Sequence, residues 1–341
     1  MALDARLAEA PRSYDIIGDV HGHASKLEAL LERMGYAFVN GAWRHPTRIA
    51  VFVGDFVDRG PRQLDTIRIV RAMVEAGAAL AVMGNHELNA IGWATESVAR
   101  PGQFLRRRDG EKGASNHHHH KEFLGQIGDG SSEHVAAVEW FKTLPMFLEL
   151  PEMRVAHACW HPEAIDVIKS RLGPLGILSE DLIQEALSEP ENREEGVLGL
   201  FDAMELVCKG VEVALPAGCD FRDQDGFARD KVRSRWWDPS ATTFRATAII
   251  KPSLLDAIPD DPIPDAAKVP QLLDKPFFFG HYWMTGQPRA LSECAVCVDY
   301  SAAKAGPLVA CRFDGGTALE RAIFVSSDEA SPSIAPRRLH P

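Results

Sequence analysis

The sequence has few cysteines and no long apolar run, and both absences narrow the class of protein. Six cysteines in 341 residues are too scattered for a disulfide framework, which predicts a reducing, cytoplasmic setting. No run of about 18 or more apolar residues occurs, so we expect no membrane-spanning helix. Residues 1–15 carry neither a basic start nor an apolar segment, so we expect no secretory signal.

Basic residues are also in the minority. The chain has 37 lysines and arginines against 48 aspartates and glutamates, for a formal net charge of −11. This balance argues against nonspecific binding to nucleic acid or to an anionic membrane. It does not exclude a substrate that carries phosphate, because bound metal ions can reverse the local field. Hydrophobic residues at 45% and charged residues at 25% are ordinary for a globular protein.

The first hundred residues alternate between strand and helix patterns. Short apolar runs predict buried strands, and apolar residues at helical spacing predict helices between them. The expected elements are strands at 14–17, 48–53 and 79–83 and helices at 24–34 and 64–76. A small hairpin is expected around Asn40-Gly41. The order β-α-β-α-β with short connections predicts a mostly parallel sheet covered by helices.

We expect residues 13–325 to form one domain with two insertions. The first, at about 95–135, is loop-rich or helical, and we expect its run His117–His120 to be a flexible loop. The second, at about 162–235, is first helical and then turn-rich. Residues 1–12 are expected to form an N-terminal extension and 326–341 a C-terminal tail.

Three short motifs follow the three predicted strands. They are GDVHG at 18–22, GDFVDRG at 54–60 and GNHE at 84–87. Because ligands bind at the carboxyl edge of an open α/β sheet, we expect these side chains to converge. Carboxylate, imidazole and amide oxygen suit divalent metals such as manganese, iron or zinc. An aspartate shared by two ions would hold them about 3.5–4 Å apart, which is the spacing of two-metal hydrolysis.

These motifs resemble those of the phosphoprotein phosphatase family of calcineurin-like metallophosphoesterases. The resemblance is specific over 13–93. Weaker matches extend it to 155–158, 279–281 and 297–299. It implies a metallophosphoesterase fold, an α/β protein built as a four-layer α/β/β/α sandwich. The two insertions are then expected to form a cap or rim.

The resemblance also implies two bound divalent ions, with manganese preferred over iron or zinc. Asp19 and His21 resemble the ligands of the first ion, and Asp55 resembles the carboxylate that bridges both ions. The ligands that share Asp55 at the second ion are then Asn85, His157 and His281. Cys159, where the family usually has glycine, departs from the pattern beside His157.

Catalytic roles are implied in the same way. His86 resembles the general acid that protonates the leaving alkoxide, Asp58 its orienting partner, and Arg59 a clamp on the substrate phosphate. A carboxylate-held histidine titrates in a range suited to that proton transfer. The family implies a second arginine clamp between the late histidines, and we take Arg235 as the candidate ahead of Arg229 and Arg233.

The sequence therefore predicts a metal-dependent phosphomonoester hydrolase. The first hypothesis is a bacterial-type protein serine/threonine phosphatase that uses attack of a metal-bridging hydroxide on phosphorus. The alternative is a dinucleoside polyphosphate (diadenosine tetraphosphate) hydrolase, in which Trp236 and Trp237 could stack a base, although core packing is the plainer interpretation. An inactive phosphatase-like binding module is disfavoured, because every matched position carries a competent residue. The expected partner is a phosphorylated protein or a small phosphate ester, with no membrane or nucleic acid.

Overall fold

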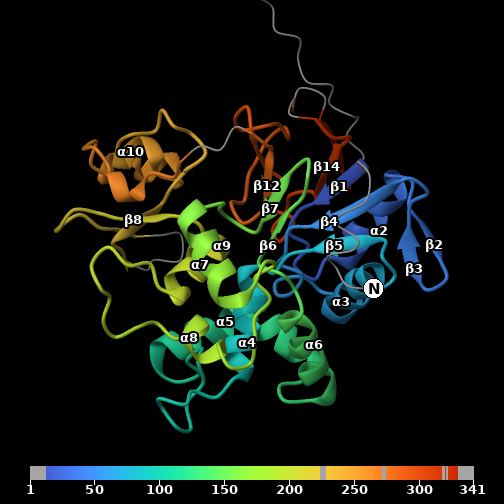
Figure 1. Cartoon of the computed structure of the whole chain (residues 1–341), viewed down its shortest axis with the longest axis horizontal. Helices are drawn as coiled ribbons and strands as arrows, with labels where there is room; N and C mark the ends of the chain where they lie inside the picture. Colours follow the sequence, from blue (N-terminus) through green and yellow to red (C-terminus); the bar gives the residue numbers. More distant parts are fainter. Residues whose placement is uncertain (1–12, 223–227, 271–273, 317–318, 320–321, 329–341) are drawn as a thin grey trace, which may run out of the picture.

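A computed structural model describes residues 13–222, 228–270, 274–316, 319 and 322–328. The expected N-terminal extension and the tail beyond 328 lie outside these residues. Two sheets form the centre of the molecule (Figure 1). No helix in the described ranges is both long and apolar enough to cross a lipid bilayer.

The first sheet contains all three strands predicted from the N-terminal third. Its order is β15-β14-β1-β4-β5. The strands are β1 (Ser13–Ile17), β4 (Arg48–Phe52), β5 (Ala79–Ala81), β14 (Val309–Phe313) and β15 (Ile323–Ser326). β1, β4 and β5 are parallel, as predicted, whereas β14 and β15 are antiparallel to their neighbours. β15 ends one residue beyond the expected domain end at 325.

The second sheet is built from the later part of the chain. Its order is β13-β12-β7-β6, with β6 (Phe147–Glu149), β7 (Arg154–Ala156), β12 (Phe277–Phe279) and β13 (Ala295–Cys297). β7, β12 and β13 are parallel, and β6 is antiparallel to β7. The carboxyl ends of β7 and β12 therefore lie at one edge of this sheet.

Alternate residues of the two sheets pack against each other. Ile16 and Val51 of the first sheet share one buried apolar cluster with Val155, Phe278 and Val296 of the second. Their neighbours in sequence point to the helices, since the side chains of a strand alternate between its two faces. The predicted four-layer sandwich is confirmed. The covering helices are α2 (Ala24–Arg33) and α3 (Gln63–Glu75) at the first sheet and α7 (Pro162–Leu172) and α9 (Leu200–Lys209) at the second.

The predicted hairpin is also confirmed. β2 (Ala37–Val39) pairs with β3 (Ala42–Arg44). Asn40 and Gly41 between them have φ angles of 53° and 83°. Two consecutive left-handed residues give the turn whose twist matches that of the flanking strands.

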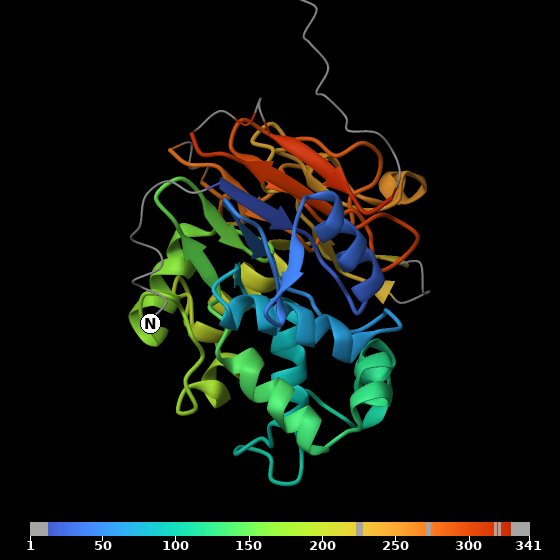
Figure 2. The same cartoon turned by 90° about the vertical axis from the view of Figure 1, so that its right-hand side faces the viewer.

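The first insertion is helical, and this corrects the prediction for its histidine run. α4 (Asn85–Ala94) is followed by α5 (Gly110–Ile127) and α6 (Ser132–Lys142), which form a helical group beside the sheets (Figure 2). His117–His120 lie inside α5 rather than in a flexible loop. Phe123, Leu124 and Ile127 anchor this helix in the core. Tertiary packing therefore stabilises a segment whose local sequence is strongly polar.

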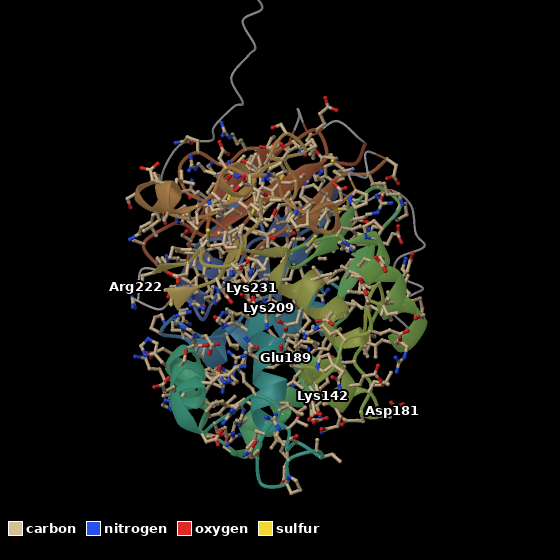
Figure 3. The ribbon with its side chains drawn as sticks, turned by 90° about the vertical axis from the view of Figure 1, so that its left-hand side faces the viewer. Lys142, Asp181, Glu189, Lys209, Arg222 and Lys231 are labelled. Atoms are coloured by element: carbon tan, nitrogen blue, oxygen red, sulfur yellow. The ribbon has the colours of Figure 1, made fainter. Side chains whose placement is uncertain are left out.

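The second insertion is helical and then turn-rich, as predicted. α7, α8 (Ile183–Leu187) and α9 are followed by short strands and a short helix. The strands are β8 (Glu212–Ala214), β9 (Phe221–Arg222), β10 (Ala228–Arg229) and β11 (Lys231–Arg233). Beyond the predicted insertion follow α10 (Phe244–Thr247) and 3₁₀ helices at Pro252–Ala257 and Asp265–Ala267. Figure 3 faces this side of the molecule, where Lys209, Arg222 and Lys231 lie across its middle.

Candidate active site

The ends of five strands bring the predicted metal ligands together. Asp19, Asp55 and Asn85 follow β1, β4 and β5 of the first sheet, and His157 and His281 follow β7 and β12 of the second. His21 lies in the loop after β1. All six side chains are buried. The ligands from the two sheets are in contact. Nε2 of His157 lies 3.1 Å from Oδ1 of Asn85, and Nδ1 of His281 lies 2.8 Å from the same oxygen.

Left-handed backbone is concentrated in these loops. His21, Asp55, Asp58, Arg59 and His281 have φ between 46° and 72°. Left-handed backbone is unfavourable for residues other than glycine, so it is found only where the surrounding structure imposes it. Two glycines allow the close approach. A Cβ atom on Gly54 would lie 2.5 Å from the backbone nitrogen of Gly84, and one on Gly84 would lie 2.3 Å from Oδ1 of Asp55.

Asp55 is the centre of the site. Its Oδ2 lies 3.5 Å from Nε2 of His21, 3.4 Å from Nε2 of His157 and 3.8 Å from Nε2 of His86. Its Oδ1 accepts a hydrogen bond from the backbone N–H of His86 at 2.9 Å. One oxygen is thus fixed by the backbone, while the other faces three imidazole nitrogens.

The outer hydrogen bonds of two of these histidines identify what the inner nitrogens are. Nδ1 of His21 donates to the carbonyl oxygen of Val57 at 3.0 Å, and Nδ1 of His157 donates to that of Val53 at 2.7 Å. A neutral imidazole with its proton on Nδ1 presents a lone pair at Nε2. In their neutral forms the two rings would therefore face the carboxylate oxygen with lone pairs, and a cation between them would satisfy all three.

The pKa values of His157 and His21 reflect the charge of Asp55 and the burial of the site. Burial by itself lowers the pKa of His157, but the charge of Asp55 and its hydrogen bond outweigh burial and raise that pKa to about 10. Burial and the neighbouring His86 lower the pKa of His21 to about 4. Without a metal, Nε2 of His157 is thus protonated beside Asp55, and a metal ion would take the place of that proton, whereas His21 stays a neutral donor. This donor set fits a divalent metal ion, which binds neutral imidazole and ionised carboxylate.

Two groups of side chains in the described part of the chain have the reach to hold an ion. One is Asp55 with His21 and His86, the other Asp55 with His157 and His281, and the ligand atoms of each group lie within 4.8 Å of one another. Asp55 belongs to both, as expected of a bridging ligand. His86, expected to be an acid, stands in the first group where Asp19 was expected.

Asp19 nevertheless lies beside this centre. Its Oδ2 accepts from the backbone N–H of His281 at 3.0 Å, while its Oδ1 is buried with no hydrogen-bond partner among the described residues. Nε2 of His281 is buried and unpartnered in the same sense. Buried polar atoms normally find a partner, so these two atoms are what remains for an ion to satisfy. Burial and the charge of Asp299 hold the pKa of Asp19 well above its usual range.

His86 and Asp58, which we predicted as a general acid and its orienting partner, are in contact. Nδ1 of His86 lies 2.5 Å from Oδ2 of Asp58. Burial lowers the pKa of His86, but the charges of Asp55 and Asp58 outweigh it and raise the pKa above its usual value. Burial raises the pKa of Asp58, and the imidazoles of His120 and His86 more than reverse that shift. The pair therefore holds a proton on His86 while Asp58 stays ionised.

Two contributors to the site were missed in the sequence. Glu87 accepts hydrogen bonds from the backbone N–H groups of Asp55, Phe56 and Gly84, at 2.8, 2.8 and 3.0 Å, and so fixes the loop that carries Asp55. Burial raises its pKa to about 7. Glu87 belongs to the GNHE motif, so its position was a usable signal. His120, which bonds Asp58, gave none, because it stands in a run of four identical residues.

The arginines considered as phosphate clamps differ in their surroundings. Arg59 is exposed at the mouth of its loop. Arg235, the expected second clamp, turns away and donates to the carbonyl oxygen of Ala248 at 3.4 Å. Arg233 instead lies over the rings of Tyr282 and Trp283, at 5.8 and 5.4 Å from their centroids. Together with burial, its charge lowers the pKa of His281. Of the two arginines, Arg233 is the one whose charge acts on a predicted metal ligand.

Trp236 and Trp237 pack in the core, as the plainer interpretation predicted. They are 9% and 6% exposed. Their rings contact Phe279 at 5.3 Å, and Nε1 of Trp236 donates to the hydroxyl of Tyr282 at 3.0 Å. They offer no free face to a base.

Residues 13–194 match the family of calcineurin-like phosphoesterases. Proteins that align with a short segment of this chain include two asymmetrical bis(5'-nucleosyl)-tetraphosphatases PrpE. The one from Halalkalibacterium halodurans is 47% identical over 74 residues, and the one from Bacillus subtilis is 44% identical over 75 residues. These alignments cover 21% and 22% of this chain and only 30% and 31% of the relatives' length.

Similar solved structures cover nearly the whole chain at low identity. A putative diadenosine tetraphosphatase has a TM-score of 0.46 at 18% identity and covers 95% of this chain and 97% of its own. A cold-active protein-tyrosine phosphatase from a psychrophilic Shewanella has a TM-score of 0.47 at 15% identity and covers 97% and 85%. The family match spans more than half of the chain, and the protein therefore belongs to the calcineurin-like phosphoesterase family.

Proposed function

We propose that the protein hydrolyses phosphomonoesters whose leaving group is an alkoxide, such as phosphorylated serine or threonine side chains. The hydrogen bond between His86 and Asp58 carries this proposal. An alkoxide is a poor leaving group and needs a proton as the P–O bond breaks, whereas a nitrophenolate or a nucleotide phosphate scarcely does. A buried histidine held by a carboxylate can supply the proton that an alkyl phosphate requires.

The direction of the His86 ring supports this role. Nδ1 is bound to Asp58, so Nε2 is the nitrogen that faces Asp55 and the centre of the site. A proton on Nε2 is therefore presented to the group bound there. Asp58 fixes the ring and stabilises its protonated form. Arg59 lies next to Asp58 in the same loop, and its planar guanidinium suits two oxygens of a phosphate.

The residues that would hold two divalent ions are Asp19, His21, Asp55, Asn85, His157 and His281. Bound there, the ions would activate water for attack on phosphorus and neutralise charge on the phosphate. Oxygen and imidazole donors without a thiolate favour manganese, with iron and zinc as alternatives. Arg233 is our candidate for the second clamp.

A second candidate function is hydrolysis of dinucleoside polyphosphates, and Trp283 favours it. This residue is 44% exposed and lies two positions after His281. Nζ of Lys304 lies 4.3 Å and the Arg233 guanidinium 5.4 Å from its ring centroid. An exposed indole among cations beside the site could stack a base and bind further phosphates. The names of the PrpE relatives point to the same substrate class.

A substrate panel separates the two functions. Manganese-loaded protein is assayed on a phosphoserine/phosphothreonine peptide, a phosphotyrosine peptide, nitrophenyl phosphate and diadenosine tetraphosphate, each with and without chelator. We expect chelator-sensitive turnover with the highest kcat/KM on the phosphoserine/phosphothreonine peptide.

Trp283→Ala sharpens the result. If the peptide is the substrate, this variant should leave its kcat/KM within about threefold of wild type. Preference for the dinucleotide, with a KM for it that rises at least about tenfold in Trp283→Ala, the size expected from losing one stacked base, would replace the first proposal with the second.

A further inference from the structure

His120 makes a second contact to the Asp58 carboxylate. Its Nδ1 lies 2.7 Å from Oδ1 of Asp58, while Nδ1 of His86 lies 2.5 Å from Oδ2. Each oxygen of one carboxylate thus receives one imidazole. His120 comes from α5, 62 residues along the chain from Asp58. The contact therefore exists only because α5 docks beside the active-site loops.

The chemistry of this contact fixes the state of the His120 ring. An ionised carboxylate only accepts hydrogen bonds, so Nδ1 of His120 carries the proton. Nε2 of His120 is buried with no partner among the residues that the structure describes. The contact to Asp58 therefore depends on Nδ1 alone.

Packing holds the His120 ring in this position. The side chain is 3% exposed. Its centroid lies 5.0 Å from that of Phe123 and 5.9 Å from the Trp93 ring. The helix is tied down further along, because Oε1 of Gln126 accepts the backbone N–H of Gln63 at 2.8 Å. The ring therefore presents Nδ1 to Oδ1 of Asp58 from a packed position.

We propose that His120 is a positioning residue that fixes the Asp58 carboxylate, so that Asp58 in turn holds His86 with Nε2 toward the substrate. This rests on the proposed function, in which His86 is the general acid. Without His120, one oxygen of Asp58 loses its donor and the carboxylate gains rotational freedom. The proton of His86 is then delivered from a wider range of ring orientations, and transfer to a poor leaving group slows.

Three variants at one position test the geometry. In His120→Asn, the amide nitrogen occupies the place of Nδ1 and can still donate to Asp58. His120→Gln places its amide nearer to Nε2, and His120→Leu has no donor. His118→Ala is the control, since His118 is exposed on the same helix. Thermal unfolding of each variant shows which ones keep the fold.

We expect His120→Leu and His120→Gln to lower kcat on an alkyl phosphate about 10- to 100-fold, the range of an orienting partner. KM should stay within about twofold, and nitrophenyl phosphate should be affected much less. His120→Asn should recover most of the loss. Equal activity in Asn, Gln and Leu variants, or equal losses on both substrates, would overturn the inference.

A measurement without turnover separates this inference from the proposed function. Nitrogen-15 NMR of the histidine rings reports which nitrogen of His86 carries a proton and how narrowly its signal is defined. We expect His120→Leu to broaden or shift that signal while His120→Asn and His118→Ala leave it unchanged. Unchanged His86 signals in His120→Leu would overturn the positioning role, whether or not the wild-type protein hydrolyses any ester of the panel.

Discussion

The loops that follow the strands and the helix α5 both bring imidazoles to the active site, but they direct them oppositely. In the loops, His21 and His157 bind backbone carbonyls through Nδ1 and turn Nε2 toward Asp55. From α5, His120 turns Nδ1 to the carboxylate of Asp58. All three rings donate through Nδ1, but the rings held by carbonyls direct Nε2 at the Asp55 carboxylate, where a cation can bind, whereas His120 directs its N–H at the Asp58 carboxylate.

His86 stands between these two arrangements. Its Nδ1 is bound to Asp58, as in the α5 arrangement, and its Nε2 faces Asp55, as in the loop arrangement. Asp55 and Asp58 are three positions apart in one loop, and both are buried and left-handed. The surroundings of these two carboxylates therefore divide the site into a half that binds cations and a half that handles a proton.

Replacing Asp55 should have the largest effect. A bridging ligand must be anionic to offset two cations, so Asp55→Asn should lose bound metal and lower turnover by roughly 10³-fold or more. Asp58→Asn is the matched control, because it should keep the metal content while losing activity on alkyl phosphates. Metal analysis after gel filtration decides the matter. Two tightly bound ions in Asp55→Asn would contradict the bridging role.

Replacing His86 should separate substrates by their leaving groups. We expect His86→Asn to lower kcat on alkyl phosphates by about 10²- to 10⁴-fold, and on nitrophenyl phosphate by about tenfold or less. The reason is that nitrophenolate leaves without a proton. Rates on both substrates, measured at saturating concentration, provide the check. Losses of equal size would place His86 in the cation-binding half alone.

Replacing Arg233 should act on substrate binding. Loss of a hydrogen bond between guanidinium and phosphate costs about 1.5–3 kcal/mol, so Arg233→Ala should lower kcat/KM about 10- to 100-fold. Arg235→Ala should change it little, because that side chain turns toward Ala248. Kinetics of both variants on one substrate compare the two positions directly. The opposite ranking would restore Arg235 as the clamp.

The same division explains how much of the site was readable in the sequence. The motifs at the strand ends predict that Asp19, Asp55 and Asn85 lie together, because a short loop after a parallel strand places its residues at the carboxyl edge of the sheet. His120 was not identified from the sequence, and Arg233 was only one of three candidates for the second clamp. Their positions depend on how α5 and β11 dock against the sheets, and nothing in their local sequences records that contact. Polar runs such as His117–His120 also hide the helical period on which assignment depends.

The smallest expected effect concerns His119, the neighbour of His120 on α5. Burial and the charges of Arg59, His86 and Arg106 lower its pKa to about 4. The unfolded chain has a histidine pKa near about 6.5, so between these values the unfolded state binds more protons than the folded state. Stability therefore falls as the pH drops through about 6.5 and stops falling on this account below about 4.

His119→Gln should remove this dependence. Relative to wild type, the variant should gain about 1 kcal/mol or less between pH 7.5 and pH 5, because the half-buried site is screened by solvent. Urea unfolding at both pH values in the presence of chelator measures the gain, with His118→Gln as the exposed control. If His119→Gln and His118→Gln show the same pH dependence, the cations around Arg59 do not reach α5. If they differ, α5 carries two adjacent histidines with different roles. His120 orders the proton-handling half of the site, and the pKa of His119 responds to the charge there.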